Sequence, residues 1–550
     1  MKLDKKDYEF NNTRICQVMP KHLELDRIMI NLYLLLKYNG HRPVTRGRAI
    51  QVTVDEIYRR LVAAHGDRLP GFADHPDVAQ EWIYSDLVDV VFRGVPEKEK
   101  VAAPVPLHLN AYKLRNAAQV ADYRGSEHLF SMIYHADPSL IGVLADFLGS
   151  GMVSGSYDTY DPSARLDMYT LAVVRMVDTP DLQERPSSDA TVLDAPLCMG
   201  QARLLSDDLR RLLAYGTVLP RPVMVGYLRT LFGLHLGLYL LRLFHQLPGW
   251  LEQRAAHPAC LNCPVRPGGN PFQPCPYAHQ NPESELALAL PELIVDAGDD
   301  YTSRMAVLAQ ESCTRHYAQI GDYTRSVFIV NQVARFAASS RARRELGHAS
   351  LNIADLIDLY ATRPAGMEDF FADQIDRILP GEELADERPD VRAVYEMERL
   401  SSFDRFIELV SLERTRYYRK YLTEQLDSVF MKNQDTGLLH QGKGKRNQRR
   451  WYLGSRMLEM LVQLALLEPA GPNAFRSRPI LIDDFLNWLH GRYGLVLVPD
   501  RDDAGIQDYQ AFNSNLRALK TRLREIGFYS DLSDAYNTQR IRPRYQVEPS

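Results

Sequence analysis

Three cysteines and two histidines gather in one short stretch of the chain, residues 257–279 (HPACLNCPVRPGGNPFQPCPYAH). Cys260 and Cys263 form C-x2-C, Cys275 follows after eleven residues, and His279 completes C-x3-H. Structural zinc binds four thiolates or imidazoles in a tetrahedron, and a two-residue gap lets both thiolates of a tight turn reach one ion. The spacing therefore predicts a zinc site formed by Cys260, Cys263, Cys275 and His279.

The composition of this stretch also suits a loop that is organised by a metal. Six prolines between residues 258 and 276 oppose a helix, and few apolar side chains are available for burial. His257 could replace His279, and Cys198 or Cys313 could supply a ligand from elsewhere. An iron–sulfur cluster is the chemical alternative. Four protein ligands leave no coordination position for a substrate, so we expect a structural site and not a catalytic one.

The C-terminal part of the chain is basic, whereas the rest is acidic. Residues 431–550 contain 18 Lys or Arg and 13 Asp or Glu, a balance of +5, while the whole chain carries −5, which leaves −10 on residues 1–430. This asymmetry is typical of a protein with a nucleic-acid contact at one end. The densest basic cluster comprises Lys443, Lys445, Arg446, Arg449 and Arg450. We expect these five side chains to contact phosphates.

After this cluster the pattern indicates a small α+β module. Residues 452–467 and 479–490 read as helices, and residues 495–498 read as a short strand. A third helix carries an apolar stripe that recurs every three or four residues. The stripe consists of Tyr509, Phe512, Leu516, Leu519, Leu523 and Ile526. The module should therefore pack its third helix on the two earlier ones.

Basic residues occupy the surfaces that this packing leaves open. Arg517, Lys520 and Arg524 fall on one face of the third helix, away from its apolar stripe. Residues 539–547 then alternate basic with apolar side chains, and Pro543 limits this segment to an edge strand. The basic members of that alternation are Arg540, Arg542 and Arg544. We predict that both sets of side chains bind nucleic acid.

The order helix, helix, short strand, helix and basic edge hairpin is typical of a winged helix. Such modules place the third helix in the major groove of duplex DNA and the wing on the backbone. The alternative interpretation is a helical protein-interaction module with a solvated basic face.

The rest of the chain reads mainly as helices. We predict a mainly α, multidomain protein with a helical body, a zinc-knuckle-like loop and a C-terminal winged-helix-like α+β module. The most apolar stretch, residues 223–247, contains Arg229, His235 and Arg242, which would be costly inside a bilayer, so a buried core helix is expected. The expected units are a small helical domain (1–105) that starts with a tail of about ten residues, a helical core domain (106–256), the metal knuckle (257–282), a helical domain (283–432), a basic linker (433–450) and the winged-helix-like module (451–550).

Three segments of the last fifth of the chain resemble a known group of proteins. They read RRWYLGSRMLEMLVQLALL, ILIDDFLNWLHGRYGLVLV and IGFYSDLSDAYNTQRIRPRY. They are similar to segments of large proteins encoded with bacterial anti-phage, methylation-associated defence systems. The resemblance implies a multiprotein defence context, and it transfers no functional residue because it includes no catalytic motif.

Together these patterns predict a non-enzymatic, nucleic-acid-binding subunit of a bacterial defence or DNA-modification assembly. It should carry structural zinc and act with other subunits in the cytoplasm, because the polar N-terminus does not read as a secretory signal. H-E-x-x-H, a serine elbow and a complete phosphate-binding loop are absent from the sequence. Two alternatives stay open: a nuclease or other enzyme whose catalytic groups meet only in space, and a pure protein–protein scaffold.

Overall fold

The computed structural model describes residues 2–41, 44–46, 52–66, 71–95, 97–177, 183–185, 193–253, 292–346, 351–379, 388–442, 448–471, 473–498, 506–529 and 539–549. The predicted zinc ligands Cys260, Cys263, Cys275 and His279 lie outside the described residues, and so do Lys443, Lys445 and Arg446. The described part is mainly helical with short strands, as the sequence predicts.

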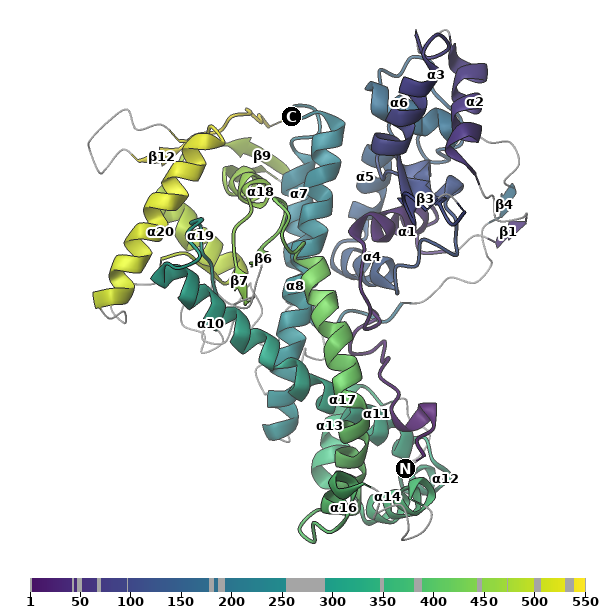
Figure 1. Ribbon diagram of the computed structural model, residues 1–550, viewed down its shortest axis with the longest axis vertical. Helices are drawn as coiled ribbons and strands as arrows, with labels where there is room; N and C mark the ends of the chain where they lie inside the picture. Colours follow the sequence, from purple (N-terminus) through teal and green to yellow (C-terminus); the bar gives the residue numbers. More distant parts are fainter. Residues whose placement is uncertain are drawn as a thin grey trace.

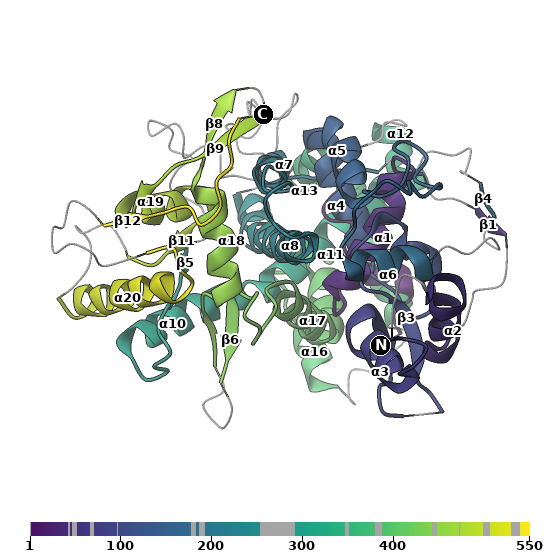
Figure 2. The same ribbon diagram turned by 90° about the horizontal axis from the view of Figure 1, so that it is seen from above.

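One long apolar helix, α8 (Arg221–Gln253), runs through the middle of the molecule (Figure 1, Figure 2). By length and composition alone α8 could cross a membrane, but 83% of its most apolar window is buried inside the protein. Of the polar side chains that interrupt it, His235 is 0% and Arg242 is 1% exposed. Arg229, in contrast, is half-buried and pairs with Asp26. Its burial supports the prediction of a core helix. The helices α7 (Met199–Leu213), α11 (Ile320–Ala337) and α17 (Ser402–Val429) pack against α8.

Two glycines let the end of α17 approach α8 closely. A Cβ atom on Gly233 would lie 2.6 Å from the carbonyl oxygen of Val429, and one on Gly237 would lie 2.5 Å from the ring of Phe430. Side chains at these positions would force the two helices apart. The contact explains why glycines are tolerated within a long buried helix despite their low helix propensity.

The N-terminal part of the chain packs on one side of α8 (Figure 2). Its α-helices are α1 (Leu25–Lys37), α2 (Val54–His65), α3 (Pro76–Trp82), α4 (Gly125–Ala136), α5 (Ser139–Leu148) and α6 (Met168–Met176). It also contains two 3-10 helices, η1 (Lys5–Asp7) and η4 (Leu109–Leu114), and a short π-helix, η3 (Ile83–Leu87). Its strands are β2 (Val88–Val91) paired with β3 (Lys100–Pro104), and β1 (Val44–Arg46) paired with β4 (Gln183–Arg185). Helix α1 packs against both α4 and α5. The expected boundary between residues 105 and 106 therefore does not separate two cores.

A second group of helices surrounds one end of α17. It comprises α12 (Ser340–Leu346), α13 (Ile353–Thr362), α14 (Ala365–Ile378) and α16 (Pro389–Tyr395). Side-chain caps fix the helix starts: Ser401 accepts a hydrogen bond from the backbone N–H of Asp404 at 3.1 Å, and Asn352 accepts one from Asp355 at 3.0 Å. These caps satisfy N–H groups that the helix itself leaves unpaired. In Figure 1 this group lies at the end of the molecule that also holds the N-terminus.

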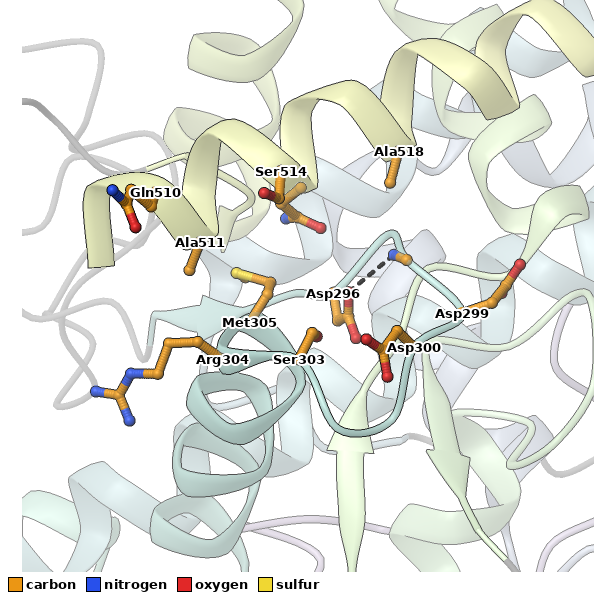
Figure 3. Close-up of a pocket in the computed structure, with 12 residues that line it drawn as sticks. Asp296, Asp299, Asp300, Ser303, Arg304, Met305, Gln510, Ala511, Ser514 and Ala518 are labelled. Carbon is orange, nitrogen blue, oxygen red and sulfur yellow. Dashed lines mark hydrogen bonds between the residues drawn. The ribbon is translucent and has the colours of Figure 1, made fainter. Parts of the chain in front are cut away.

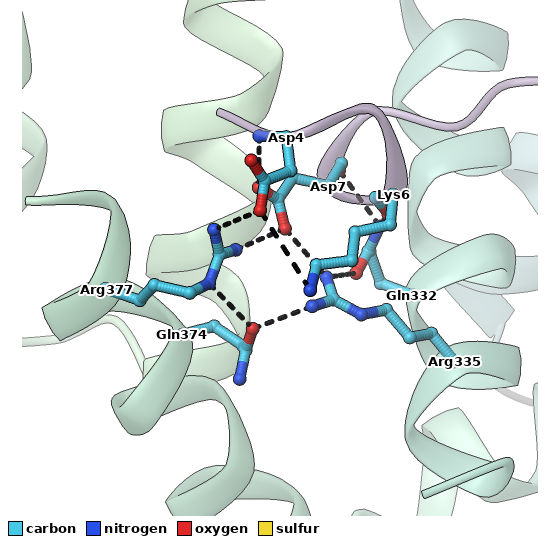
Figure 4. Close-up of polar contacts among 7 residues, drawn as sticks. All are labelled: Asp4, Lys6, Asp7, Gln332, Arg335, Gln374 and Arg377. Atoms are coloured by element: carbon cyan, nitrogen blue, oxygen red, sulfur yellow. Dashed lines mark hydrogen bonds and ion pairs between the residues drawn. The ribbon is translucent and has the colours of Figure 1, made fainter. Parts of the chain in front are cut away.

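The first residues do not form the expected tail, but a strap (residues 2–23, the N-terminal strap) that docks on α11, α14 and α17. Asp7 is fully buried and receives hydrogen bonds from Arg335 of α11, at 2.8 Å, and from Arg377 of α14, at 2.5 Å (Figure 4). Phe10 stacks on a tyrosine of α17 with ring centroids 4.3 Å apart. A buried charge with two partners and a stacked ring hold the strap in place.

The C-terminal unit mixes helices and short strands. It comprises β5 (Leu293–Ile294), α10 (Arg304–Ala318), β6 (Leu439–Gln441), β7 (Arg449–Trp451), α18 (Ser455–Ala465), β8 (Leu467–Gly471), β9 (Ala474–Ser477), β10 (Ile480–Leu481), α19 (Ile482–Tyr493), β11 (Leu495–Val496), α20 (Ile506–Glu525) and β12 (Arg540–Ile541). The pairs β6–β7, β8–β9 and β10–β12 are antiparallel, and β5–β11 is parallel. Helix α10 packs against β7 and α20.

This packing corrects three details that the sequence suggests. Residues 283–432 and 451–550 are expected in separate domains, but β5 and α10 of the first share strand pairs and packing with the second. The expected linker 433–450 contributes the paired strands β6 and β7. Helix α19 begins at Ile482 and not at Pro479, because β10 pairs with β12 just before it. It ends at Tyr493, followed by Gly494 (φ 74°), and not before Gly491.

Candidate nucleic-acid interface

Helix α20 is fixed in its rotation by one buried amide. The Nδ2 atom of Asn515 donates to the carbonyl oxygens of Val295 and Leu497, both at 2.9 Å, and its Oδ1 accepts from the backbone N–H of Ala297 at 2.7 Å. Asn515 is 2% exposed, so these bonds replace water completely. A helix anchored in this way presents a defined face to solvent.

The apolar side of α20 follows the predicted stripe in most positions. Leu519 and Leu523 are completely buried and Phe512 is 6% exposed. Tyr509 is the exception, with 49% of its surface exposed near the start of the helix. The stripe prediction is therefore correct for the middle of α20 and wrong at its first residue.

The basic face of α20 points away from this stripe, as predicted. Arg517 and Arg524 are exposed. Lys520 is partly buried between them, and its Nζ donates to the Oε1 of Gln539 at 2.6 Å. Burial lowers the pKa of Lys520 from its ordinary value. This hydrogen bond joins the basic face to the chain segment that begins β12.

Strand β12 and the residues after it show the predicted alternation. Arg540 and Arg542 are exposed, whereas Ile541 between them is completely buried. Arg544 is turned back onto the protein: its Nη1 donates to the carbonyl oxygen of Ile526 at 2.9 Å and lies 3.4 Å from the carboxylate of Glu459. All three predicted arginines are thus exposed, and Arg544 also contacts the end of α20.

Arg449 and Arg450 form ion pairs with carboxylates from other elements. The Nε and Nη2 of Arg449 donate to the two carboxylate oxygens of Asp427 at 2.7 and 2.8 Å. Burial alone would raise the pKa of Asp427, but hydrogen bonds from Arg449 and Lys432 lower it below its ordinary value. Arg450 is 1% exposed and pairs with Asp296. The surface position expected for Arg450 is therefore wrong, and Arg449 is engaged within the fold.

A pocket of about 640 Å³ opens beside α20, and it is acidic (Figure 3). Asp296, Asp299 and Asp300 line one wall, and small or polar side chains of α20 line the other. The carboxylate of Asp299 accepts a hydrogen bond from Tyr452 at 2.7 Å. Burial raises the pKa of Asp296, and Arg450 offsets this only in part. Carboxylates repel phosphates, so this pocket is unsuited to phosphates, and the predicted phosphate contacts would have to be made by the basic face.

Several residues that shape the interface carry no signal in the sequence. Asn515, which fixes the rotation of α20, bonds to backbone groups about 220 residues earlier in the chain. Gln539 and the acids Asp296 and Asp427 likewise act through partners distant in sequence. Their side chains differ in no visible way from other polar residues until the fold is known.

The described residues contain no group of three or more His, Cys, Asp or Glu that could hold a metal ion.

Fold and charge together define a mainly helical protein with a C-terminal basic surface. The chain belongs to the family described as methylation-associated defense system protein MAD7, whose profile matches residues 5–545. The family match thus spans nearly the whole chain and not mainly its last fifth. No curated protein and no solved structure matches the chain.

Proposed function

We propose that this chain is the nucleic-acid-binding component of its bacterial anti-phage defence system, and that it contacts duplex phosphates through Arg517, Arg524, Arg540 and Arg542. The observation that carries this proposal is the shared location of these side chains. Lys520, one turn from both helix arginines, bonds to Gln539, the residue that precedes Arg540. Among the described residues, Arg517, Arg540 and Arg542 form no ion pair, which leaves their charges available for an anion.

The order of elements in the C-terminal unit supports a winged-helix-like mode of binding. Helix α18, strand β10, helices α19 and α20, and strand β12 follow in this order, and β12 returns to pair with β10. In winged helices the third helix enters the major groove and the following wing contacts the backbone. Two additions, the β8–β9 hairpin and the pairing of β11 with β5, set this unit apart from a minimal module.

Salt dependence of binding tests the proposal directly. Each phosphate contact releases a counterion, so four contacts give a slope of about −4 for log affinity against log salt. Full-length protein should bind a labelled random duplex with this slope, measured by fluorescence anisotropy. The double variant Arg540→Gln/Arg542→Gln should weaken binding about tenfold or more and reduce the slope by about 2.

The matched control is the double variant Arg341→Gln/Arg343→Gln on α12, which removes the same charge from another part of the molecule. It should bind duplex as the unchanged protein does. If the unchanged protein binds no duplex at low salt, the proposal is wrong, and an acidic protein partner becomes the better explanation of the basic face. Magnesium-dependent cleavage of the duplex would instead support the nuclease alternative.

A structural zinc site completes the proposal. The chemistry of the donor set supports it, because three thiolates and one imidazole at C-x2-C and C-x3-H spacing are typical zinc ligands. Cys260, Cys263, Cys275 and His279 would hold the ion and stabilise a segment with few apolar side chains. The other three cysteines, Cys16, Cys198 and Cys313, are buried.

A further inference from the structure

The exposed side of α17 carries a second basic surface, in a part of the molecule remote in sequence from α20. Arg416, Arg419 and Lys420 are exposed on the second half of this helix. Lys420 lies 4.0 Å from Glu424, whereas Arg416 and Arg419 form no ion pair among the residues that the structure describes. Lys21 of the N-terminal strap lies against the same helix. Three cations therefore face solvent here, with the half-buried Lys21 beside them. The acidic neighbours on the helix are Glu424 and Glu413, and Glu413 is already paired with Arg388.

Tyrosine rings are interleaved with these cations. Tyr417 is 44% exposed, and its ring centroid lies 4.7 Å from that of Tyr421, one turn further along α17. The Nζ of Lys21 lies 3.9 Å from the centroid of Tyr421 and donates to the hydroxyl of Tyr417 at 3.3 Å. The ammonium group covers Tyr421, so the open aromatic ring of the pair is Tyr417.

A third tyrosine is held at this surface by an unusual backbone. Tyr123 (φ 46°) and Arg124 (φ 66°) are consecutive residues in the left-handed region, which bulky side chains rarely adopt. The carbonyl oxygen of Tyr123 accepts a hydrogen bond from the backbone N–H of Met19 at 2.9 Å, which ties it to the N-terminal strap. Tyr123 as a whole stays 36% exposed. Strained backbone of this kind concentrates at functional sites.

The charge state of Lys21 fits a surface that meets anions. Burial alone would lower the pKa of Lys21, but the hydrogen bond with Tyr417 and the nearby hydroxyls of Tyr421 and Tyr123 raise it. The ammonium group therefore keeps its proton over the whole neutral range. Its position is fixed by the rings and not by a carboxylate, so its charge is not neutralised.

We propose that this α17 surface (Lys21, Arg416, Tyr417, Arg419 and Lys420) binds single-stranded nucleic acid. Proteins that bind single strands combine cations that follow the phosphates with aromatic rings on which bases stack, and this surface contains both. An acidic peptide would use the cations, whereas a single strand would use the cations for its phosphates and the exposed tyrosine ring for base stacking. The α17 surface is distinct from the basic face of α20 and does not depend on its duplex-binding role.

The experiment uses the full-length protein with labelled oligo-dT and oligo-U as separate probes. Tyr417→Ala should weaken binding of at least one probe about tenfold, since base stacking on an aromatic ring contributes about 1–3 kcal/mol per base. Tyr417→Phe, which keeps the ring, should retain most of the affinity that Tyr417→Ala loses. Arg416→Gln/Arg419→Gln should weaken binding and reduce its salt dependence by about two counterions.

Two controls separate this inference from the proposed function. Tyr395→Ala removes a tyrosine of similar exposure, 49%, from α16 and should bind single strands normally. Arg540→Gln/Arg542→Gln should lose duplex affinity and keep single-strand affinity. The inference is overturned if neither probe binds at low salt, or if Tyr417→Ala and Tyr395→Ala bind equally. The inference is also overturned if polyglutamate displaces the probe and Tyr417→Ala and Tyr417→Phe lose equal affinity for it. That result would favour an acidic protein as the partner.

Discussion

Arg492 of α19 lies against Asp208 of α7, with its Nε 3.0 Å from the Oδ1 of the carboxylate, although 284 residues separate them along the chain. Asp208 is fully buried and also accepts hydrogen bonds from the Nε2 of His235, at 3.0 Å, and the hydroxyl of Tyr493, at 2.7 Å. Burial alone would raise the pKa of Asp208, but Arg492 and His235 lower it to about 2. This group joins the C-terminal unit to the central helices.

Arg492→Met should destabilise the protein by about 3–5 kcal/mol, because it leaves the Asp208 carboxylate buried without its cation. Chemical denaturation followed by circular dichroism measures the loss. Asp208→Asn combined with Arg492→Met should be more stable than Arg492→Met alone, since the uncompensated charge is gone. Unchanged stability of the single variant would show that the pair does not hold the units together.

Asp7→Asn should loosen the N-terminal strap. The substitution removes the charge that holds Arg335 and Arg377, and breaking a buried ion pair costs about 3–5 kcal/mol. Hydrogen exchange measured on this variant should increase more, relative to the unchanged protein, in residues 2–23 than in the rest of the chain. Asp4→Asn is the matched control, because the side chain of Asp4 is 51% exposed and its loss should change little. Equal exchange in both variants would contradict the role of Asp7.

Acidification should destabilise the protein below about pH 6.5, the ordinary pKa of histidine. Burial lowers the pKa of His108, His128 and His316 to about 3 in the folded chain. Between pH 6.5 and 3 the unfolded chain therefore binds protons that the folded chain does not, so stability falls as pH falls through this range.

His128→Gln should make the free energy of unfolding less dependent on pH, because His128 is completely desolvated by its surroundings. Loss of one titrating proton lowers the slope by up to about 1.4 kcal/mol per pH unit. Melting temperatures at pH 5, 6 and 7 measure the slope. His75→Gln, which replaces a histidine at an exposed position, is the matched control. An identical slope in the His128 variant would show that this histidine does not contribute.

Purified protein should contain about one zinc ion per chain, the number expected for one four-ligand site. Cys263→Ser should lose the ion and lower the melting temperature, because structural zinc binding is coupled to folding. Elemental analysis by mass spectrometry measures the metal. Cys16→Ser tests a cysteine outside the predicted ligand set and should keep the ion. A protein without metal that melts as before would contradict the proposed site.

Features that depend on near neighbours in the chain were predictable from the sequence. The buried α8, the position of β11, most of the α20 stripe and the exposure of Arg540 and Arg542 around Ile541 follow from local periodicity. Each of these features is set by side chains within a few residues of one another. The family resemblance was visible in the last fifth of the chain and extends over residues 5–545.

Features that depend on distant partners were not predictable. A basic cluster reads as an exposed linker until Asp427 and Asp296 are seen to hold Arg449 and Arg450. Pro479 reads as a helix start because nothing nearby shows that residues 480–481 pair with β12. The polar first residues read as a tail because the buried partners of Asp7 lie more than 300 residues away. The position of the predicted zinc ligands stays a prediction.

The parallel pairing of β5 with β11 has a consequence for the synthesis of this protein. Leu293 and its neighbour leave the ribosome about 200 residues before their partners Leu495 and Val496. During that interval α10 lacks α20, and the edge of β5 has unpaired backbone groups. Because this long-range pairing must wait for its partner, we expect the C-terminal unit to complete its fold late. A chaperone or an early-bound subunit would have its greatest effect in this interval, before the last fifth of the chain has emerged.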